Sequence, residues 1–378
     1  MIGLKLKQRN SIVILKMFSF CSSFIYLLFE FFAHFFPDQK DDITNFPLDE
    51  KSEKVFDRLP SNSTMNVAIS IIIPVYNSAQ TLKRCLNSVV DGMLESANDV
   101  EVIIVNDGSP DNSDDIVKPY LEHGYFVYVH QNNCGFSGAR NTGIKMAKGE
   151  YVYFLDSDDQ LKPGAIMMMR KVLKRKADLV QFSYEVESNG KTSEHIFDDV
   201  ELEKCDDVFE HPWSGFPWGK LMKKELIMPF GFPEGFWFED TVLPAIVFPR
   251  VNSYVLSSFV VQQYFINPEG ITVSAKRNTK SLDHYRVSEY LFREQCELGL
   301  VPTVASVSFW REHLTARGFA RIRQLNSDTK KLAFKYFCRI MAAHPEFLAD
   351  NRSVKSRVIN LSVNKHLYFL WKTVSFLG

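Results

Sequence analysis

The chain has 378 residues, 46% of them hydrophobic, and its formal net charge is -1 at pH 7. This length accommodates one large domain or two of ordinary size, and the apolar content is enough for a substantial core. The balanced charge gives no electrostatic reason to expect nucleic-acid binding as the main function. The six cysteines are scattered and lack zinc-ligand spacing, which argues against a disulfide framework or a structural zinc site.

The N-terminal segment, residues 1–36, is hydrophobic and rich in phenylalanine from residue 12 onward. Its longest uncharged run, residues 17–29, falls short of the roughly 20 residues that comfortably cross a bilayer. The segment therefore predicts either a marginal spanning helix or a helix that lies in the membrane surface. Residues 37–66 are polar and aperiodic, and we expect them to form a linker.

From residue 67 onward, apolar runs alternate with amphipathic segments. Buried strands are predicted at residues 67–73, 100–105 and 125–129, and a fourth begins after Gly149. Strands that alternate with amphipathic helices are typical of βαβ units and a mostly parallel sheet. Polar residues follow each strand, at the edge where such sheets bind their ligands.

The second half of the chain has a less regular pattern. A helix is predicted at residues 163–176 and strands at 178–183 and 255–266, whereas residues 186–210 are charged and weakly patterned. An aromatic and proline-rich stretch, residues 211–237, leads to an acidic pair at 239–240. Helical periodicity runs from residue 281 to the end. The basic, apolar segment 352–376 predicts either a helix against an anionic membrane or a terminal helix packed on the protein.

The fourth strand ends in a cluster of acids, Asp156, Asp158 and Asp159. Clustered carboxylates repel one another unless a cation or a proton compensates their charge. Oxygen ligands suit Mg²⁺ or Mn²⁺, and Mg²⁺ is commonly held by a few carboxylates together with substrate phosphates. The cluster therefore predicts a divalent-metal site, with a solvated acidic turn as the alternative.

Four motifs in this order resemble those of the family 2 glycosyltransferases: Ile71-Ile-Ile-Pro-Val-Tyr-Asn77, Val102-Ile-Ile-Val-Asn-Asp-Gly-Ser109, Asn141-Thr-Gly143 and Phe154-Leu-Asp-Ser-Asp-Asp159. The resemblance extends more loosely through residues 218–221, 239–240 and 271–274. It implies an α/β GT-A nucleotide-diphosphosugar transferase fold, with a mostly parallel sheet flanked by helices. The catalytic domain would span residues 67–275, with a nucleotide-binding half at 67–183 and an acceptor half at 184–275. A helical C-terminal region would follow at 276–378.

The resemblance also implies which residues bind the nucleotide-sugar donor. Asp107 would accept a hydrogen bond from the base, and because a carboxylate only accepts, it would favour uracil or thymine. Arg140 could contact phosphate through its guanidinium fork, or pair with Asp107 or Asp156. The full set of donor-binding residues expected is Pro74, Tyr76, Asn77, Asp107, Gly138, Arg140, Asn141, Asp156 and Ser157.

The same resemblance assigns the metal ligands and the base. Asp158 would bind Mn²⁺ or Mg²⁺ directly, and Asp156 would contact the ribose or reach the metal through water. The role of Asp159 stays open. The family inverts the anomeric centre in one displacement, in which a carboxylate takes the proton of the acceptor hydroxyl. We expect Asp240 to be that base, with Glu239 as the second candidate. Acids that stabilise a helix N-terminus are the alternative reading of this pair.

The expected protein is therefore an inverting hexosyl- or N-acetylhexosaminyl-transferase, with a UDP-sugar donor and a carbohydrate or lipid-linked glycan acceptor. Trp213, Trp218 and Trp237 could stack on acceptor sugars or simply pack. One alternative is a catalytically inactive nucleotide-sugar-binding or membrane scaffold protein. Another is a nucleotidyltransferase, although the Gly-rich phosphate loop typical of such enzymes is absent from the first strand end.

The predicted location is the membrane, with the catalytic domain on the cytoplasmic side, where nucleotide sugars are made. A spanning N-terminal helix that obeys the positive-inside rule would instead place this domain outside. The conflict disappears if the helix lies in the membrane surface or if translation starts at Met65. A lumenal, type II anchored enzyme is the alternative, and the sequon Asn62-Ser63-Thr64 would permit it.

Overall fold

The computed structural model describes residues 67–93, 99–202, 208–228, 230–267, 277–349 and 353–376. These residues divide into two compact units: one holds residues 67–267 and 290–305, and the other holds residues 277–289 and 306–376. The predicted N-terminal segment, the linker and the loosely matching stretch 271–274 lie outside the described residues. Within the described ranges, no helix is long and apolar enough to cross a membrane.

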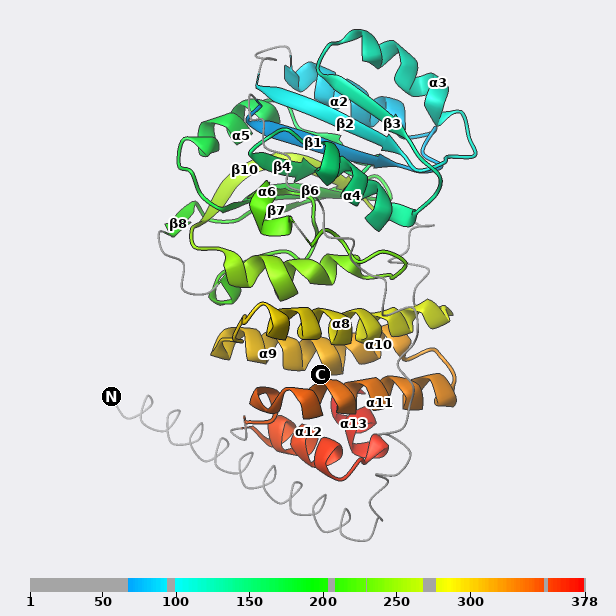
Figure 1. The fold of residues 1–378 in the computed structure, drawn as a ribbon, viewed down its shortest axis with the longest axis vertical. Coiled ribbons are helices and arrows are strands. Elements are labelled where there is room, and N and C mark those ends of the chain that lie inside the picture. The colour runs from blue at the N-terminus through cyan, green and yellow to red at the C-terminus, as the bar shows by residue number, and fades with distance from the viewer. Residues whose placement is uncertain are drawn as a thin grey trace, which may run out of the picture. The chain divides into compact units, whose positions relative to one another are not determined.

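The first unit is built on one sheet, which contains ten strands among the described residues (Figure 1). Its main path runs in the order β3-β2-β1-β4-β9-β6-β10-β5, with β7 added beside β6 and β8 beside β10. The strands are β1 (Ile69–Val75), β2 (Val100–Asn106), β3 (Phe126–His130), β4 (Tyr151–Phe154), β5 (Gln160–Leu161), β6 (Leu179–Ser188), β7 (Lys191–His195), β8 (Val200–Leu202), β9 (Lys220–Lys223) and β10 (Tyr254–Phe265).

The half of the sheet from β3 to β4 is parallel throughout, as the alternating pattern predicted. Ile69, Ile71 and Ile73 of β1 join a core with the apolar faces of α2 (Leu82–Met93), α3 (Ser113–Val117) and α5 (Ala165–Leu173). On the opposite face, α4 (Gly135–Met146) approaches Ile72 so closely that a Cβ at Gly143 would lie 2.3 Å from its Cγ2. Both faces are thus buried, which explains why the strands are continuous apolar runs.

The other half of the sheet, from β9 to β10, is mixed. β9 runs antiparallel between β4 and β6, and β10 returns parallel to β6. A hairpin joins β6 to β7 at Asn189 and Gly190, whose φ angles are 54° and 76°. Asn-Gly is the preferred sequence for such a turn, so the charged segment 186–210 contained a hairpin signal that the periodicity analysis missed.

Short helices complete the first unit. They are η3 (Lys118–Glu122), η4 (Val208–Glu210), α6 (Lys224–Ile227), η5 (Glu239–Thr241), η6 (Leu243–Val247) and η7 (Phe248–Arg250). The helical segments from residue 279 onward are η9 (Thr279–Leu282), α8 (Asp283–Glu297), α9 (Val304–Glu312), η10 (His313–Arg317), α10 (Gly318–Ile322), α11 (Ser327–Ala343), η11 (Pro345–Leu348), α12 (Val354–Asn364) and α13 (Tyr368–Phe376). The predicted helical C-terminal region is confirmed.

The second unit packs around a set of buried aromatic side chains that includes Tyr285, Phe337 and Trp371. Arg339 forms a bidentate ion pair with Glu289, with both N···O distances at 2.8 Å. A fork-to-fork pair of this kind fixes the geometry between two helices as well as contributing energy. All four described cysteines are free thiols, as expected from their scattered spacing.

Candidate active site

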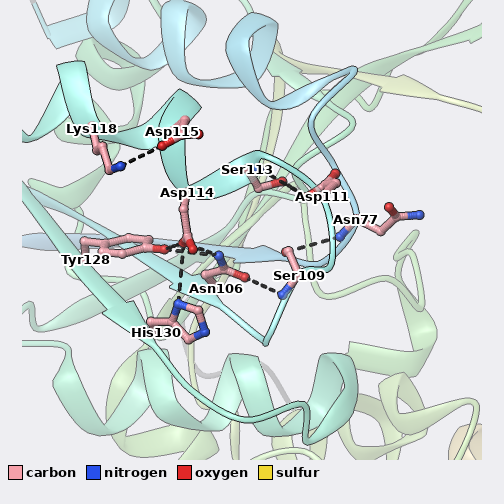
Figure 2. A network of polar contacts seen from close by, with 10 residues as sticks. All are labelled: Asn77, Asn106, Ser109, Asp111, Ser113, Asp114, Asp115, Lys118, Tyr128 and His130. Atoms are coloured by element: carbon pink, nitrogen blue, oxygen red, sulfur yellow. Dashed lines mark hydrogen bonds and ion pairs between the residues drawn. The ribbon is translucent and has the colours of Figure 1, made fainter.

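The loop after β2 is held by a polar network that Figure 2 shows. The buried Asn106 donates to Asp114 at 2.6 Å, and its amide oxygen accepts from the Ser109 backbone N–H at 2.9 Å. Ser109 Oγ then accepts from the backbone N–H of Asn77 at 3.2 Å. Hydrogen bonds to its carboxylate lower the pKa of Asp114, and the bond from the Tyr128 hydroxyl makes the largest contribution. The network ties the turn after β1 to the loop after β2.

Asp107 is the first residue after β2, and it is buried. Its Oδ1 accepts hydrogen bonds from Gln131 Nε2 at 2.7 Å and from the Cys134 backbone N–H at 2.8 Å. Its Oδ2 is buried and has no hydrogen-bond partner among the described residues. An unpartnered buried acceptor is uncommon and costs free energy, so Oδ2 is an acceptor that lacks a donor.

The acidic loop after β4 is anchored from several directions. Ser157 Oγ lies 2.7 Å from Ser78 Oγ, in the turn after β1. Arg84 of α2 donates to the Asp158 carbonyl oxygen and stacks on the Phe265 ring, with its guanidinium carbon 3.6 Å from the ring centroid. Burial and the neighbouring charge of Asp156 raise the pKa of Asp158 to about 6.

Asp159 is fully buried, and it has a structural role. Its Oδ2 accepts from Gln262 Nε2 at 2.7 Å, and its Oδ1 accepts from the Phe265 backbone N–H at 2.9 Å. Tyr153 donates its hydroxyl to the same glutamine at 2.6 Å. Asp159 therefore fastens the acidic loop to β10, at the point where that strand ends.

Arg140 connects two acidic motifs that are far apart in the sequence. Its side chain is 7% exposed; one guanidinium nitrogen lies 2.9 Å from Asp156 Oδ1 and the other 2.6 Å from Glu239 Oε1. Its Nε is buried without a partner among the described residues. Of the alternatives left open by the sequence, Arg140 pairs with Asp156 and not with Asp107.

The acidic pair at residues 239–240 begins the short helix η5. Phe238, just before it, has a φ of 65°, a strained conformation for a bulky residue. Burial raises the pKa of Glu239, the charge of Arg140 opposes that rise, and the charge of Asp240 adds to it. Burial lowers the pKa of Lys220 to about 7, and the charge of Asp240 counteracts this.

The donor set suits a hard divalent cation that also binds substrate. Among the described residues, no three His, Cys, Asp or Glu side chains could hold a metal ion by themselves. Asp156 and Asp158 offer carboxylate oxygens two residues apart, and Arg84 holds the loop by donating to the Asp158 backbone carbonyl. Mg²⁺ sites of enzymes that act on phosphates commonly have one or two carboxylates and take the remaining ligands from substrate and water.

Comparison with known proteins decides the family. The model described as Glycosyl transferase family 2 matches residues 70–228. The putative glycosyltransferase EpsH of Bacillus subtilis (strain 168) is 35% identical over 284 residues, which cover 68% of this chain and 82% of EpsH. The chain belongs to the family 2 glycosyltransferases.

Two further sequence relatives match shorter parts of this chain than EpsH does, and one solved structure matches a larger part. GlyA of Streptococcus pneumoniae serotype 4 is 34% identical over 209 residues, which cover 51% of this chain and 29% of GlyA. The poly(ribitol-phosphate) beta-N-acetylglucosaminyltransferase TarP of Staphylococcus aureus (strain N315) is 34% identical over 163 residues, which cover 42% of this chain and 50% of TarP. The crystal structure of S. aureus TarS 1–349 in complex with UDP-GlcNAc superimposes with a TM-score of 0.67 at 20% identity, over 82% of this chain and 90% of that one. This likeness confirms the predicted GT-A fold class.

The remaining predicted site residues of this glycosyltransferase lie at the end of β1, in the turn that follows it, and in α4. Pro74 is the sixth residue of β1, Tyr76 is 52% exposed, and Asn77 has a φ of 51° in the turn that follows. The Asn141 amide donates to the Phe232 carbonyl at 2.9 Å and accepts from its backbone N–H at 2.7 Å, so it fixes the loop that carries Phe232. Gly138 lies so close to Cys134 that a Cβ there would be 2.4 Å from the cysteine Cβ.

Sequence reasoning missed three residues that hold the site together. Arg84 and Gln262 anchor the acidic loop, and the fully buried Lys220 donates to Ser214 Oγ at 2.7 Å and to the Phe216 carbonyl at 2.6 Å. Lysine is almost never fully buried without partners, but burial is invisible in a sequence. Arg84 gave no signal either, since a basic residue on an amphipathic helix is ordinarily solvated.

Proposed function

We propose that this protein is an inverting glycosyltransferase that moves a sugar from a UDP-sugar to a carbohydrate or lipid-linked glycan acceptor. The observation that carries the proposal is the bridge at Arg140, which brings the acids after β4 and the acidic pair 239–240 into one site. Arg140 and Glu239 are 99 residues apart in the sequence. A scaffold that only binds nucleotides has no need of the second acidic pair.

The residues after β1 and β2 would bind the nucleotide. The exposed Tyr76 offers an aromatic face and a hydroxyl beside a turn that the Asn106 network keeps rigid. The unpartnered Oδ2 of Asp107 would gain a donor from the imide N–H of uracil. This pairing supports UDP over nucleotides whose bases present an acceptor at that position.

Asp158 would hold a divalent cation, Mn²⁺ or Mg²⁺, with Asp156 beside it. When bound, such a cation supplies positive charge that stabilises the leaving diphosphate. Arg140 orients the Asp156 carboxylate, and Ser157 ties the loop to the turn that would contact the base. The chain's own contribution is a preorganised set of oxygens, which costs little reorganisation at the moment of reaction.

Asp240 would act as the base that removes the acceptor's proton. Glu239 is the weaker candidate because its carboxylate is already engaged by Arg140 at 2.6 Å. Asp240 lies next to it and close enough to Lys220 for their charges to interact. Inversion then follows from a single displacement, in which the base and the leaving group lie on opposite sides of the sugar.

The names of the relatives suggest the donor to test first. TarP is an N-acetylglucosaminyltransferase, and TarS was solved with UDP-GlcNAc. UDP-GlcNAc is therefore our first candidate donor, followed by the corresponding hexose donors.

We also propose that the protein works at the cytoplasmic face of the membrane. In α13, Phe369, Lys372 and Phe376 are exposed at helical spacing, and the described segment 353–376 carries basic residues without acids. Such a face suits an anionic lipid surface. Co-sedimentation with phosphatidylglycerol vesicles, but not with phosphatidylcholine vesicles, is the expected result; equal recovery from both would contradict it.

Donor hydrolysis tests the proposed function. Purified protein is incubated with UDP-GlcNAc, UDP-glucose or UDP-galactose, with Mn²⁺ or with EDTA, and released UDP is measured. We expect the wild type to hydrolyse at least one of these donors. This hydrolysis should require Mn²⁺ and should be lost in Asp158→Ala. Asp115→Ala is the matched control, since this acid on α3 is exposed and forms a surface ion pair with Lys118. Neither hydrolysis nor metal-dependent binding of any UDP-sugar would contradict the proposal.

A further inference from the structure

Three near-parallel aromatic rings form a cluster in the acceptor-side half of the first unit. The centroids of Phe216 and Trp218 are 4.7 Å apart with 7° between the ring planes. Those of Trp218 and Tyr264 are 4.9 Å apart with 18° between the planes. Trp218 is only 2% exposed, whereas Phe216 is 38% exposed. The cluster is therefore buried at its centre and reaches solvent at Phe216.

The cluster lies beside the acidic loop. Trp218 forms a bridge with Phe154, two residues before Asp156. Tyr264 lies between the two residues of β10 that hold the Asp159 carboxylate. In the sheet, β9 and β10 lie on the other side of β4 from β1 and β2, whose ends carry the proposed nucleotide contacts. The cluster thus occupies the acceptor's side of the acidic loop and not the nucleotide's side.

The loop that carries Phe216 is rigid and is connected to the proposed base. Lys220 Nζ donates to the Phe216 carbonyl at 2.6 Å and to Ser214 Oγ at 2.7 Å. The same lysine interacts with the charge of Asp240. Gly219, with a φ of 69°, provides the turn between Trp218 and Lys220. An exposed aromatic side chain that is fixed in this way loses little entropy when a ligand packs on it.

Of the three stacked rings, Phe216 is the most exposed, and it suits a sugar ring. Trp218 is buried, and Trp213 packs edge-on against Phe209 and Phe248. Two of the three tryptophans considered from sequence are therefore packing residues. A pyranose with equatorial hydroxyls presents a face of axial C–H bonds, and the negative face of an aromatic ring attracts such hydrogens.

We propose that Phe216, backed by Trp218, is the platform on which a pyranose ring of the acceptor stacks. The acceptor would then be a glycan with a pyranose at its accepting end, and not an acyclic polyol phosphate. This inference rests on the proposed transferase function, because it assigns the acceptor side of the same site.

Binding of simple pyranosides tests the platform. Methyl β-D-glucopyranoside and methyl N-acetyl-β-D-glucosaminide are titrated by saturation-transfer NMR into full-length protein with UDP and Mn²⁺, with ribitol 5-phosphate as the acyclic comparison. The wild type is expected to bind a pyranoside through its axial-face protons. Phe216→Ala and Phe216→Leu are expected to weaken that binding about tenfold, the factor that corresponds to ~1.4 kcal/mol, within the range of aromatic stacking. Phe216→Trp should retain it.

Three controls keep the outcomes distinct. Ile196→Ala removes another exposed apolar side chain of the same unit and should leave pyranoside affinity unchanged. Mn²⁺-dependent donor hydrolysis should be equal in wild type and Ile196→Ala, which shows that removing an exposed apolar side chain does not by itself impair the nucleotide site. Thermal melts check that each variant is folded at the assay temperature; Phe216→Ala loses its stack on Trp218, and a modest decrease in melting temperature is expected from that loss.

The proposal is overturned if pyranosides bind wild type and both Phe216→Ala and Phe216→Leu equally. It is also overturned if a wild type that hydrolyses UDP-GlcNAc binds ribitol 5-phosphate or no pyranoside at all. Failure of donor binding and hydrolysis in the wild type would instead contradict the proposed transferase function. Pyranoside binding to Phe216 would still be measurable in that protein, so the two failures can be told apart.

Discussion

Replacing Arg140 by methionine is the most informative single perturbation of the site. The guanidinium is buried, and it is the cation that joins Asp156 and Glu239. Methionine fills a similar volume without charge. The variant therefore leaves two neighbouring carboxylates without their shared partner.

The size of the effect follows from burial. The Glu239 side chain is 11% exposed, so its pair is a buried one, and removing one partner of a buried pair costs about 3–5 kcal/mol. The Asp156 side chain is 26% exposed and can recover part of its hydration, so that pair adds less. We expect Arg140→Met to lower the free energy of unfolding by about 3–5 kcal/mol near pH 8.

The loss should depend on pH in a defined direction. Burial already raises the pKa of Glu239, with Arg140 opposing the rise, so removal of Arg140 raises it further. A group whose folded pKa lies above its unfolded value, about 4.3 for Glu, stabilises the folded state fully below that value. This contribution is lost as the pH rises through the folded pKa. The variant should therefore approach wild-type stability as the pH falls from 8 towards 5.

Urea denaturation at several pH values, combined with a double-mutant cycle, measures both effects. Glu239→Gln is the second mutation, because it keeps the shape of the side chain and removes its charge. In the Glu239→Gln background, Arg140→Met should cost at least ~1 kcal/mol less than in wild type. Unchanged stability in Arg140→Met, or additive effects in the cycle, would refute the bridge as the element that holds the two motifs together.

Three further predictions test other parts of the account. Asp240→Asn should leave donor binding intact and reduce transfer about 10²–10⁴-fold; transfer at the wild-type rate would show that the base is another residue. Gly143→Ala should destabilise the protein by about 1–3 kcal/mol in thermal or urea melts, because its Cβ would lie 2.3 Å from Ile72 Cγ2, whereas Gly124→Ala, with open space around it, should not. Burial tends to raise the pKa of Asp178, but the hydrogen bonds and positive charge around its carboxylate, led by the hydrogen bond from Lys223, together outweigh this and lower the pKa. The ionised Asp178 therefore stabilises the folded state above pH ~4, and this stabilisation is lost below it. The stability difference between wild type and Asp178→Asn should narrow in acid, and a constant difference would contradict the pairing.

Local sequence predicted the first half of the fold well because its elements are locally determined. The run Ile69 to Val75 is buried on both faces, and such strands read as continuous apolar segments. Chemistry-bearing residues follow the strand ends, so Asp107 and Asp158 could be proposed as site residues before any contact was known. The sheet edge then brings them together because neighbouring strands are parallel.

Long-range pairing could not be predicted in the same way. The insertion of β9 between β4 and β6 depends on contacts between segments far apart in the chain, and no local pattern specifies it. The role of Asp159 depends on Gln262, 103 residues away. The sequence left Asp107 and Asp156 open as acidic partners of Arg140. The fold pairs Arg140 with Asp156 and also with Glu239. The sequence does not single out Phe216 as a sugar platform, because exposure separates it from the buried Trp218 and exposure is a tertiary property.

Metal-dependent binding of UDP tests the central claim most directly. Isothermal titration of UDP is performed on wild type and Asp158→Ala, each with Mn²⁺ and with EDTA. The account predicts that wild type binds UDP in Mn²⁺ much more tightly than in EDTA, and that Asp158→Ala loses this difference. Equal UDP affinity in wild type with and without metal, or full metal dependence in Asp158→Ala, would contradict the account.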